Sequence, residues 1–78
     1  MNEEINAKEV GKELERMRSE RGASQAEIAK ELGITAMAIS QYERGERIPR
    51  DTLKMRIARI FGRSVGDLFY GESKQTVN

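Results

Sequence analysis

In the first third of the chain, apolar residues recur among polar ones with the period of an α-helix. Three apolar residues at i, i+4 and i+7 share one helix face: Val10, Leu14 and Met17. Asn6 precedes this stripe and Glu9 follows it by three positions, which is the form of a capping box. The pattern predicts a helix over about 7–21, ended by Gly22.

The same signals divide the remaining sequence into four further short helices. Ser24 and Thr35 are placed as N-caps, and glycines follow each apolar stripe as stop signals. We therefore expect helices over about 25–32, 36–44 and 51–61, and a short one opened by Ser64. The helix over 51–61 is expected to bury Leu53, Ile57, Ala58, Ile60 and Phe61.

No segment shows a convincing strand pattern, so the predicted fold class is all-α with five helices. A chain of 78 residues is expected to form one small domain. We place this domain over residues 1–70. Residues 71–78 are polar and lack periodicity, which predicts a flexible C-terminal tail.

The amino-acid composition argues against most classes of enzyme. The sequence has no cysteine and no histidine, so thiolate nucleophiles, the usual zinc ligands and the commonest proton-transfer side chain are missing. No nucleophile–base pair or glycine-rich phosphate loop can be assembled either. We predict a protein that is not an enzyme and that holds neither a metal nor a cofactor.

The chain also lacks the features of a membrane or secreted protein. Its longest apolar run, 36–39, is far below the roughly 18 residues of a membrane span. The first residues are acidic, whereas a signal peptide begins with basic ones. We expect a cytoplasmic protein with no membrane partner.

Charge is distributed unevenly along the chain. The formal net charge is only +1, yet residues 34–63 hold seven bases against three acids. Such a concentration of positive charge favours an anionic partner at the middle of the chain.

Two short helices joined by the link 33–35 have the spacing of a helix-turn-helix. The motifs Ser24–Ala29, Leu32–Thr35 and Ile39–Gly45, followed by Ile48–Pro49, closely resemble the phage-repressor and Cro-like helix-turn-helix family, the xenobiotic-response-element type of bacterial regulators. The resemblance covers roughly residues 10–69. It implies a compact lambda-repressor-like domain that binds double-stranded DNA, with the helix over 36–44 in the major groove.

The resemblance assigns base contacts to the exposed positions of that helix, which here are Ala36, Met37 and Gln41. The amide of Gln41 has the groups for a bidentate contact with adenine. Ala36 and Met37 differ from the polar residues usual in the family, so they offer only apolar contacts such as those with thymine methyl groups. Alternatively, these two are surface or dimer residues.

Contacts to the DNA backbone are expected at the helix ends and in the following arginines. The resemblance implies that Gln25, the first residue of its helix, grips a phosphate, and a helix N-terminus favours anions. The remaining candidates for backbone contact are Thr35, Ser40, Arg44, Arg47 and Arg50. An arginine run is otherwise a solvated surface.

Arg18 and Glu43 are expected to have a structural role. In the family that this chain resembles, an arginine of the first helix pairs with a glutamate of the recognition helix, and both residues are present here. If this pair is buried, loss of one partner destabilises the fold by roughly 3–5 kcal/mol.

A homodimer is expected because a core this small gives limited stability. The candidate interface consists of Val65, Leu68, Phe69 and Tyr70, an apolar surface that either the domain's own core or a second copy must cover.

The sequence therefore predicts a sequence-specific, double-stranded DNA-binding transcriptional regulator that acts as a homodimer. Repression is the commoner mode in the family that it resembles, and a regulatory protein partner is one route of control. The alternative is a protein-interaction module, such as an antitoxin-like or adaptor subunit. The apolar start of the helix over 36–44 favours this alternative, and the arginine excess counts against it.

Overall fold

The computed structural model describes residues 5–71, which form five helices. They are α1 (Ala7–Glu20), α2 (Gln25–Leu32), α3 (Ala36–Glu43), α4 (Asp51–Ile60) and α5 (Val65–Tyr70). The predicted all-α class is confirmed, and each predicted boundary lies within about one residue of the observed one. Of the predicted tail, Gly71 alone falls among the described residues, as the left-handed C-cap of α5; residues 72–78 lie outside them, as do residues 1–4.

Four of the helices begin at a side-chain cap that the sequence predicted. Asn6, Ser24, Thr35 and Ser64 each accept a hydrogen bond from the backbone N–H three residues later, over 3.0–3.1 Å. At Ser24 the box is complete, because the Glu27 carboxylate also accepts from the Ser24 N–H. These bonds satisfy N–H groups that a helix leaves without internal partners, and so they fix where each helix begins.

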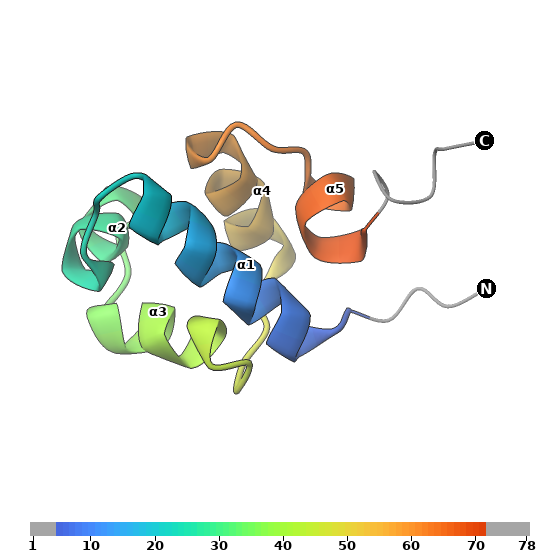
Figure 1. Cartoon of the computed structure of the whole chain (residues 1–78), viewed down its shortest axis with the longest axis horizontal. Helices are drawn as coiled ribbons and strands as arrows, with labels where there is room; N and C mark the ends of the chain where they lie inside the picture. The colour runs from blue at the N-terminus through green and yellow to red at the C-terminus, as the bar shows by residue number, and fades with distance from the viewer. Residues whose placement is uncertain (1–4, 72–78) are drawn as a thin grey trace.

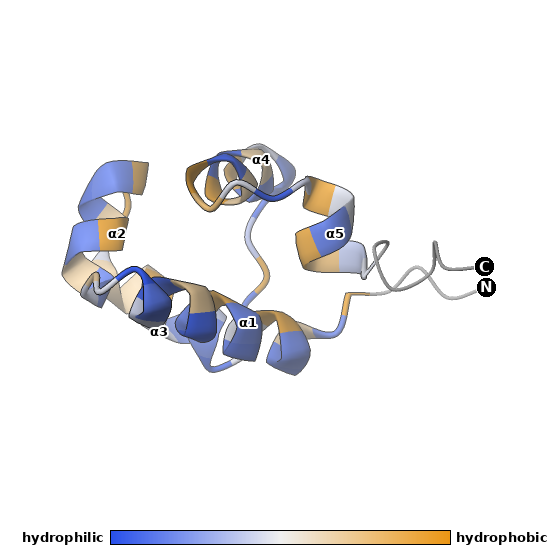
Figure 2. Cartoon of the chain, turned by 45° about the horizontal axis from the view of Figure 1, so that its top comes forward, coloured by the Kyte–Doolittle hydropathy of each residue, from blue (hydrophilic) through white to orange (hydrophobic). Residues whose placement is uncertain are grey.

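The helices pack around one core (Figure 1). Helix α1 lies against α3 and α5, α2 against α3 and α4, and α4 against α5. Each helix carries both hydrophobic and hydrophilic residues (Figure 2). The buried apolar residues come from all five: Val10, Leu14, Met17, Ile28, Ala29, Leu32, Ile39, Tyr42, Ile57, Ala58, Leu68 and Phe69. One shared core therefore holds the short helices, none of which would be stable alone.

Helix α4 differs from its predicted burial. Of its five expected core residues, Ile57 and Ala58 are buried, and the other three are half-buried. Lys54 is buried instead, because it lies one turn before Ile57 and Ala58 on the same stripe. Its ammonium donates to the Asp51 carboxylate and to the Tyr70 hydroxyl, each over 3.1 Å.

The four candidate dimer residues differ in how much surface they leave accessible. Leu68 and Phe69 are 5% and 2% exposed within a single chain, so the domain's own core covers them and leaves little surface for a second copy. The amphipathic period of α5 turns these two inward, toward α4 and α1. Val65 is half-buried and Tyr70 is 37% exposed, so they are the candidates that retain accessible surface.

Two glycines allow α1 to approach the end of α3 closely. A Cβ at Gly11, inside α1, would lie 2.3 Å from the carbonyl oxygen of Glu43 and 2.6 Å from that of Tyr42. Gly45, just after α3, has φ +75°, and a Cβ there would lie 2.9 Å from the Cα of Lys8. Only residues without a side chain fit this contact, which sets the position of α3 against α1.

Candidate nucleic-acid interface

Helices α2 and α3 are joined by the tight link 33–35. Gly33 ends α2 in the left-handed conformation, with φ +75° and ψ 29°. The N–H of Ile34 then donates to the carbonyl of Ala29 over 2.9 Å, and Thr35 caps α3. Since Ile34 packs against the core, the link is held from inside and fixes the angle between the two helices.

Helix α3 has an inner side and an outer side. Ile39, Tyr42 and Glu43 are buried, and they face the rest of the domain. On the outer side Ala36 is exposed, Met37 is 69% exposed and Gln41 is half-buried. The three predicted base-contact residues are therefore all accessible, although Gln41 is so only in part.

The inner side is fixed by an ion pair between the half-buried Arg18 and the buried Glu43. The Arg18 guanidinium donates from Nε to Glu43 Oε2 over 2.6 Å and from Nη2 to Oε1 over 3.0 Å. Its Nη1 donates to the Ala23 carbonyl over 2.9 Å. These bonds to Glu43 raise the pKa of Arg18, although burial acts in the opposite direction. Arg18 and Glu43 thus tie α1 to the end of α3, as the sequence predicted.

Gln25 also contacts Glu43. Its side-chain Nε2 donates to Glu43 Oε1 over 2.9 Å, so this amide links the start of α2 to the end of α3. The sequence assigned Gln25 a phosphate contact and gave no indication of this bond. Of the groups at this position, the backbone N–H at the helix N-terminus is the one best suited to an anion.

Gln41 and Arg47 contact each other on the outer side. The Arg47 Nη1 donates to the Gln41 Oε1 over 3.0 Å, and its guanidinium lies over the Tyr42 ring, 5.4 Å from the centroid. The sequence treated the two residues as separate DNA contacts. Their six-residue separation spans the end of α3, so helical spacing alone did not indicate that they meet.

The other predicted backbone contacts lie around the ends of α3. Arg44 hydrogen-bonds the Ser40 hydroxyl and forms a bidentate ion pair with Glu46 at 2.9 and 3.0 Å. Thr35 is exposed and its oxygen accepts the cap bond, which leaves its O–H as a donor. Arg50 is exposed beside the start of α4.

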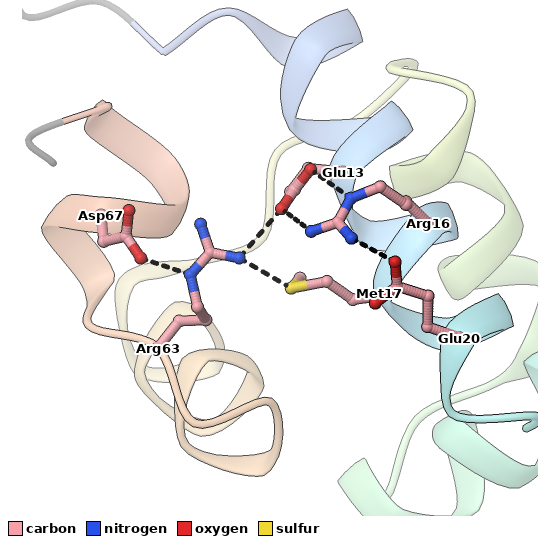
Figure 3. A network of polar contacts seen from close by, with 6 residues as sticks. All are labelled: Glu13, Arg16, Met17, Glu20, Arg63 and Asp67. Carbon is pink, nitrogen blue, oxygen red and sulfur yellow. Dashed lines mark hydrogen bonds and ion pairs between the residues drawn. The ribbon is translucent and has the colours of Figure 1, made fainter. Parts of the chain in front are cut away.

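Some of the basic residues between positions 34 and 63 form ion pairs within the domain. Arg63 bridges α1 and α5, because it pairs with Glu13 at 2.9 Å and with Asp67 (Figure 3). Glu13 also accepts from Arg16. Hydrogen bonds from Arg16 and Arg63 lower the pKa of Glu13 from 4.5 to about 2. The charge count along the sequence could not separate these paired bases from those that face solvent.

The described residues offer no other obvious chemistry. Within 5–71, no three carboxylates are grouped so as to hold a metal ion. No helix in the same range is both long and apolar enough to cross a membrane.

Comparison with known proteins identifies the class to which this exposed helix belongs. The family model described as "Helix-turn-helix" matches residues 14–68. The chain therefore belongs to the helix-turn-helix family of the phage-repressor and Cro type, a family of DNA-binding transcription regulators. No curated protein matches the chain in sequence.

Solved structures show the same fold. The P22 c2 repressor, solved in complex with a synthetic operator, is 27% identical with a TM-score of 0.76, and the match covers 80% of this chain and 94% of that one. The clp gene regulator ClgR from Corynebacterium glutamicum is 24% identical with a TM-score of 0.73, over 86% of this chain and 71% of that one. The five helices therefore form the lambda-repressor-like domain that the sequence predicted.

An enzyme contains a similar domain. Hydroxypropylphosphonic acid epoxidase from S. wedmorenis is 26% identical with a TM-score of 0.72, over 87% of this chain. The match spans 36% of the epoxidase, so the likeness is confined to about a third of that protein.

Proposed function

We propose that this protein is a sequence-specific regulator that binds double-stranded DNA with α3 in the major groove. The observation that carries the proposal is the outer side of α3, where Ala36, Met37 and Gln41 are accessible while the inner side is locked to α1. A single helix fits the major groove, and side chains on its outer side reach the base edges. The P22 c2 repressor, which has the same fold, was solved with an operator.

The contacts divide into base reading and backbone positioning. Met37 and Ala36 supply apolar surface for thymine methyl groups, and Gln41 supplies the polar base contact. The N-terminus of α2 at Gln25 and the Thr35 hydroxyl bind phosphates. The remaining backbone contacts come from Ser40, Arg44, Arg47 and Arg50. These supply affinity with little sequence discrimination.

The protein acts in the cytoplasm as a homodimer on two half-sites about one helical turn apart, and it represses transcription. The dimer contact uses the accessible surface of α5 around Val65 and Tyr70. Sedimentation equilibrium tests this part, since Tyr70→Ala is expected to shift the chain toward monomer. An unchanged monomer–dimer constant would remove α5 from the interface.

The test of DNA recognition is selection of bound duplexes from a random pool by wild type and by Gln41→Ala. We expect a two-fold-symmetric site whose affinity falls steeply with salt, because phosphate contacts release counterions. In Gln41→Ala the preference at one position of each half-site should relax by roughly 1–3 kcal/mol. Failure to enrich any sequence would contradict the proposal.

The second candidate function is a protein-interaction module of the antitoxin or adaptor kind. The observation in its favour is the uncharged first turn of α3, in which Met37 is 69% exposed. Weak, sequence-independent binding in the selection, together with capture of a partner chain that Met37→Asp abolishes, would favour it over DNA reading.

A further inference from the structure

The acceptor atom of Gln41 is already used within the protein. Its side-chain oxygen accepts a hydrogen bond from Arg47 over 3.0 Å. A guanidinium can only donate, so the amide oxygen must face Arg47, and the NH₂ group points elsewhere. The orientation of this amide is therefore set by its neighbour before any DNA arrives.

Arg47 is itself held in place. Its guanidinium lies over the ring of Tyr42, 5.4 Å from the centroid, and Tyr42 is 5% exposed. A cation stacked on an aromatic face that belongs to the core has a fixed platform beneath it. The buried Tyr42 ring thus positions Arg47, and Arg47 in turn positions the Gln41 side chain on the outer side of α3.

A parallel contact lies beside it. Arg44 donates to the Ser40 hydroxyl oxygen, which leaves the Ser40 hydrogen as the group it can offer. Two polar side chains in the second half of α3 therefore have their oxygen engaged by an arginine that follows the helix. In both side chains, the group left to offer a partner is a hydrogen-bond donor.

This arrangement changes which base Gln41 suits. Reading adenine with two bonds requires the amide oxygen to accept from the adenine N6 amino group, while the NH₂ donates to N7. The oxygen has a second lone pair, but an amino hydrogen brought to it would lie beside the positive guanidinium. Guanine instead presents two acceptors, N7 and O6, which an outward NH₂ group and the nearby cation both attract.

We propose that Arg47 is a positioning and specificity-determining residue, which holds the Gln41 amide with its NH₂ outward and so directs it to guanine rather than adenine. The inference rests on the proposed function, since it concerns how α3 reads DNA. It replaces the adenine contact that the sequence alone suggested for Gln41.

The experiment compares base preference in selected duplexes for wild type, Gln41→Ala, Arg47→Met and Arg47→Lys. The half-site position that loses its preference in Gln41→Ala identifies the base under Gln41. We expect guanine there in wild type, favoured by about tenfold. Arg47→Met should shift that position toward adenine, and Arg47→Lys, which keeps a donor, should retain guanine.

Arg50→Met is the matched control. It removes one positive charge from the same segment, and affinity should fall at every sequence without a change of base preference. Circular dichroism and thermal unfolding check that each variant is folded; Arg47 is exposed, so Arg47→Met should unfold close to wild type. In the free protein, the Gln41 side-chain NH₂ resonances should shift in Arg47→Met and not in Arg50→Met.

Three results would overturn the inference. Adenine under Gln41 in wild type, or a guanine preference that Arg47→Met leaves unchanged, would each show that Arg47 does not direct the amide, while the proposed function would stand. Enrichment of no sequence by wild type would overturn both the inference and the proposed function.

Discussion

The two sides of α3 are built for different purposes, although they belong to one eight-residue helix. The inner side is close-packed, with Tyr42 and Glu43 against Gly11 and a bidentate ion pair to Arg18. On the outer side Met37 extends into solvent. The contacts on the inner side alone therefore position the helix. The residues of the outer side can differ without loss of the fold, and so they can be suited to a particular DNA sequence.

The largest expected effect is on the inner side, from Glu43→Ala. The variant leaves the half-buried Arg18 guanidinium without its carboxylate and also removes the acceptor for Gln25. We expect the free energy of unfolding to fall by about 3–5 kcal/mol. Urea denaturation measures it, with Arg16→Ala as the control, because an exposed pair contributes at most about 1 kcal/mol. Equal losses in the two variants would contradict the ranking of buried over exposed pairs.

Gly11→Ala tests the close approach itself. Alanine is the better helix former, yet its Cβ would overlap the backbone carbonyls of Tyr42 and Glu43. We expect a loss of about 2–3 kcal/mol in unfolding free energy, typical of overpacking against atoms that cannot move aside. Lys12→Ala, at the exposed neighbouring position, should stay within about 0.5 kcal/mol of wild type. A Gly11→Ala protein as stable as wild type would show that α3 can shift freely.

A second ion pair of α1, between Glu13 and Arg63, is more exposed than the pair between Arg18 and Glu43. It therefore tests how much exposure weakens such a pair. The pKa of Glu13 is lowered from 4.5 to about 2 in the folded state, so its contribution is present above about pH 4.5 and is lost as pH falls toward 2. We expect wild type to lose about 1 kcal/mol more stability than Glu13→Gln between about pH 5 and about pH 2, after allowance for solvent screening. Parallel pH profiles of unfolding for the two proteins would remove this contribution.

The smallest expected effect on stability is on the outer side, from Met37→Ala. Since the side chain is 69% exposed, unfolding should change by less than about 0.5 kcal/mol. Binding to the selected duplex should nevertheless weaken by about 1 kcal/mol, as the contact with thymine methyl groups is lost. Isothermal titration checks binding, and thermal unfolding checks the fold. A large loss of stability with unchanged binding would assign Met37 to the structure instead.

The sequence predicted local structure well because its signals are local. A capping residue such as Ser24 and a stop such as Gly33 act within a few positions, so the helix boundaries could be read directly. The family motifs likewise placed Arg18 opposite Glu43. Burial of Lys54 escaped prediction, because a lysine is normally exposed and its partner Tyr70 lies sixteen residues away.

Parts of the site escaped prediction for the same reason. The close approach at Gly11 was not predicted, since a contact between two helices leaves no periodic signal in the sequence. The contacts Gln25–Glu43 and Arg47–Gln41 depend on how α2, α3 and the following loop meet in space. Predicting the residue types of an interface is thus easier than predicting which of their atoms remain available.

We propose that the outer side of α3 reads DNA and that the inner side does not. The most direct test is a titration of ¹⁵N-labelled protein with the selected duplex, followed by NMR. We expect the largest shifts at the amides of Ala36 and Met37, at the Gln41 side-chain NH₂ and at the Gln25 N–H. Shifts concentrated on α4 and α5, with α3 unchanged, would contradict it.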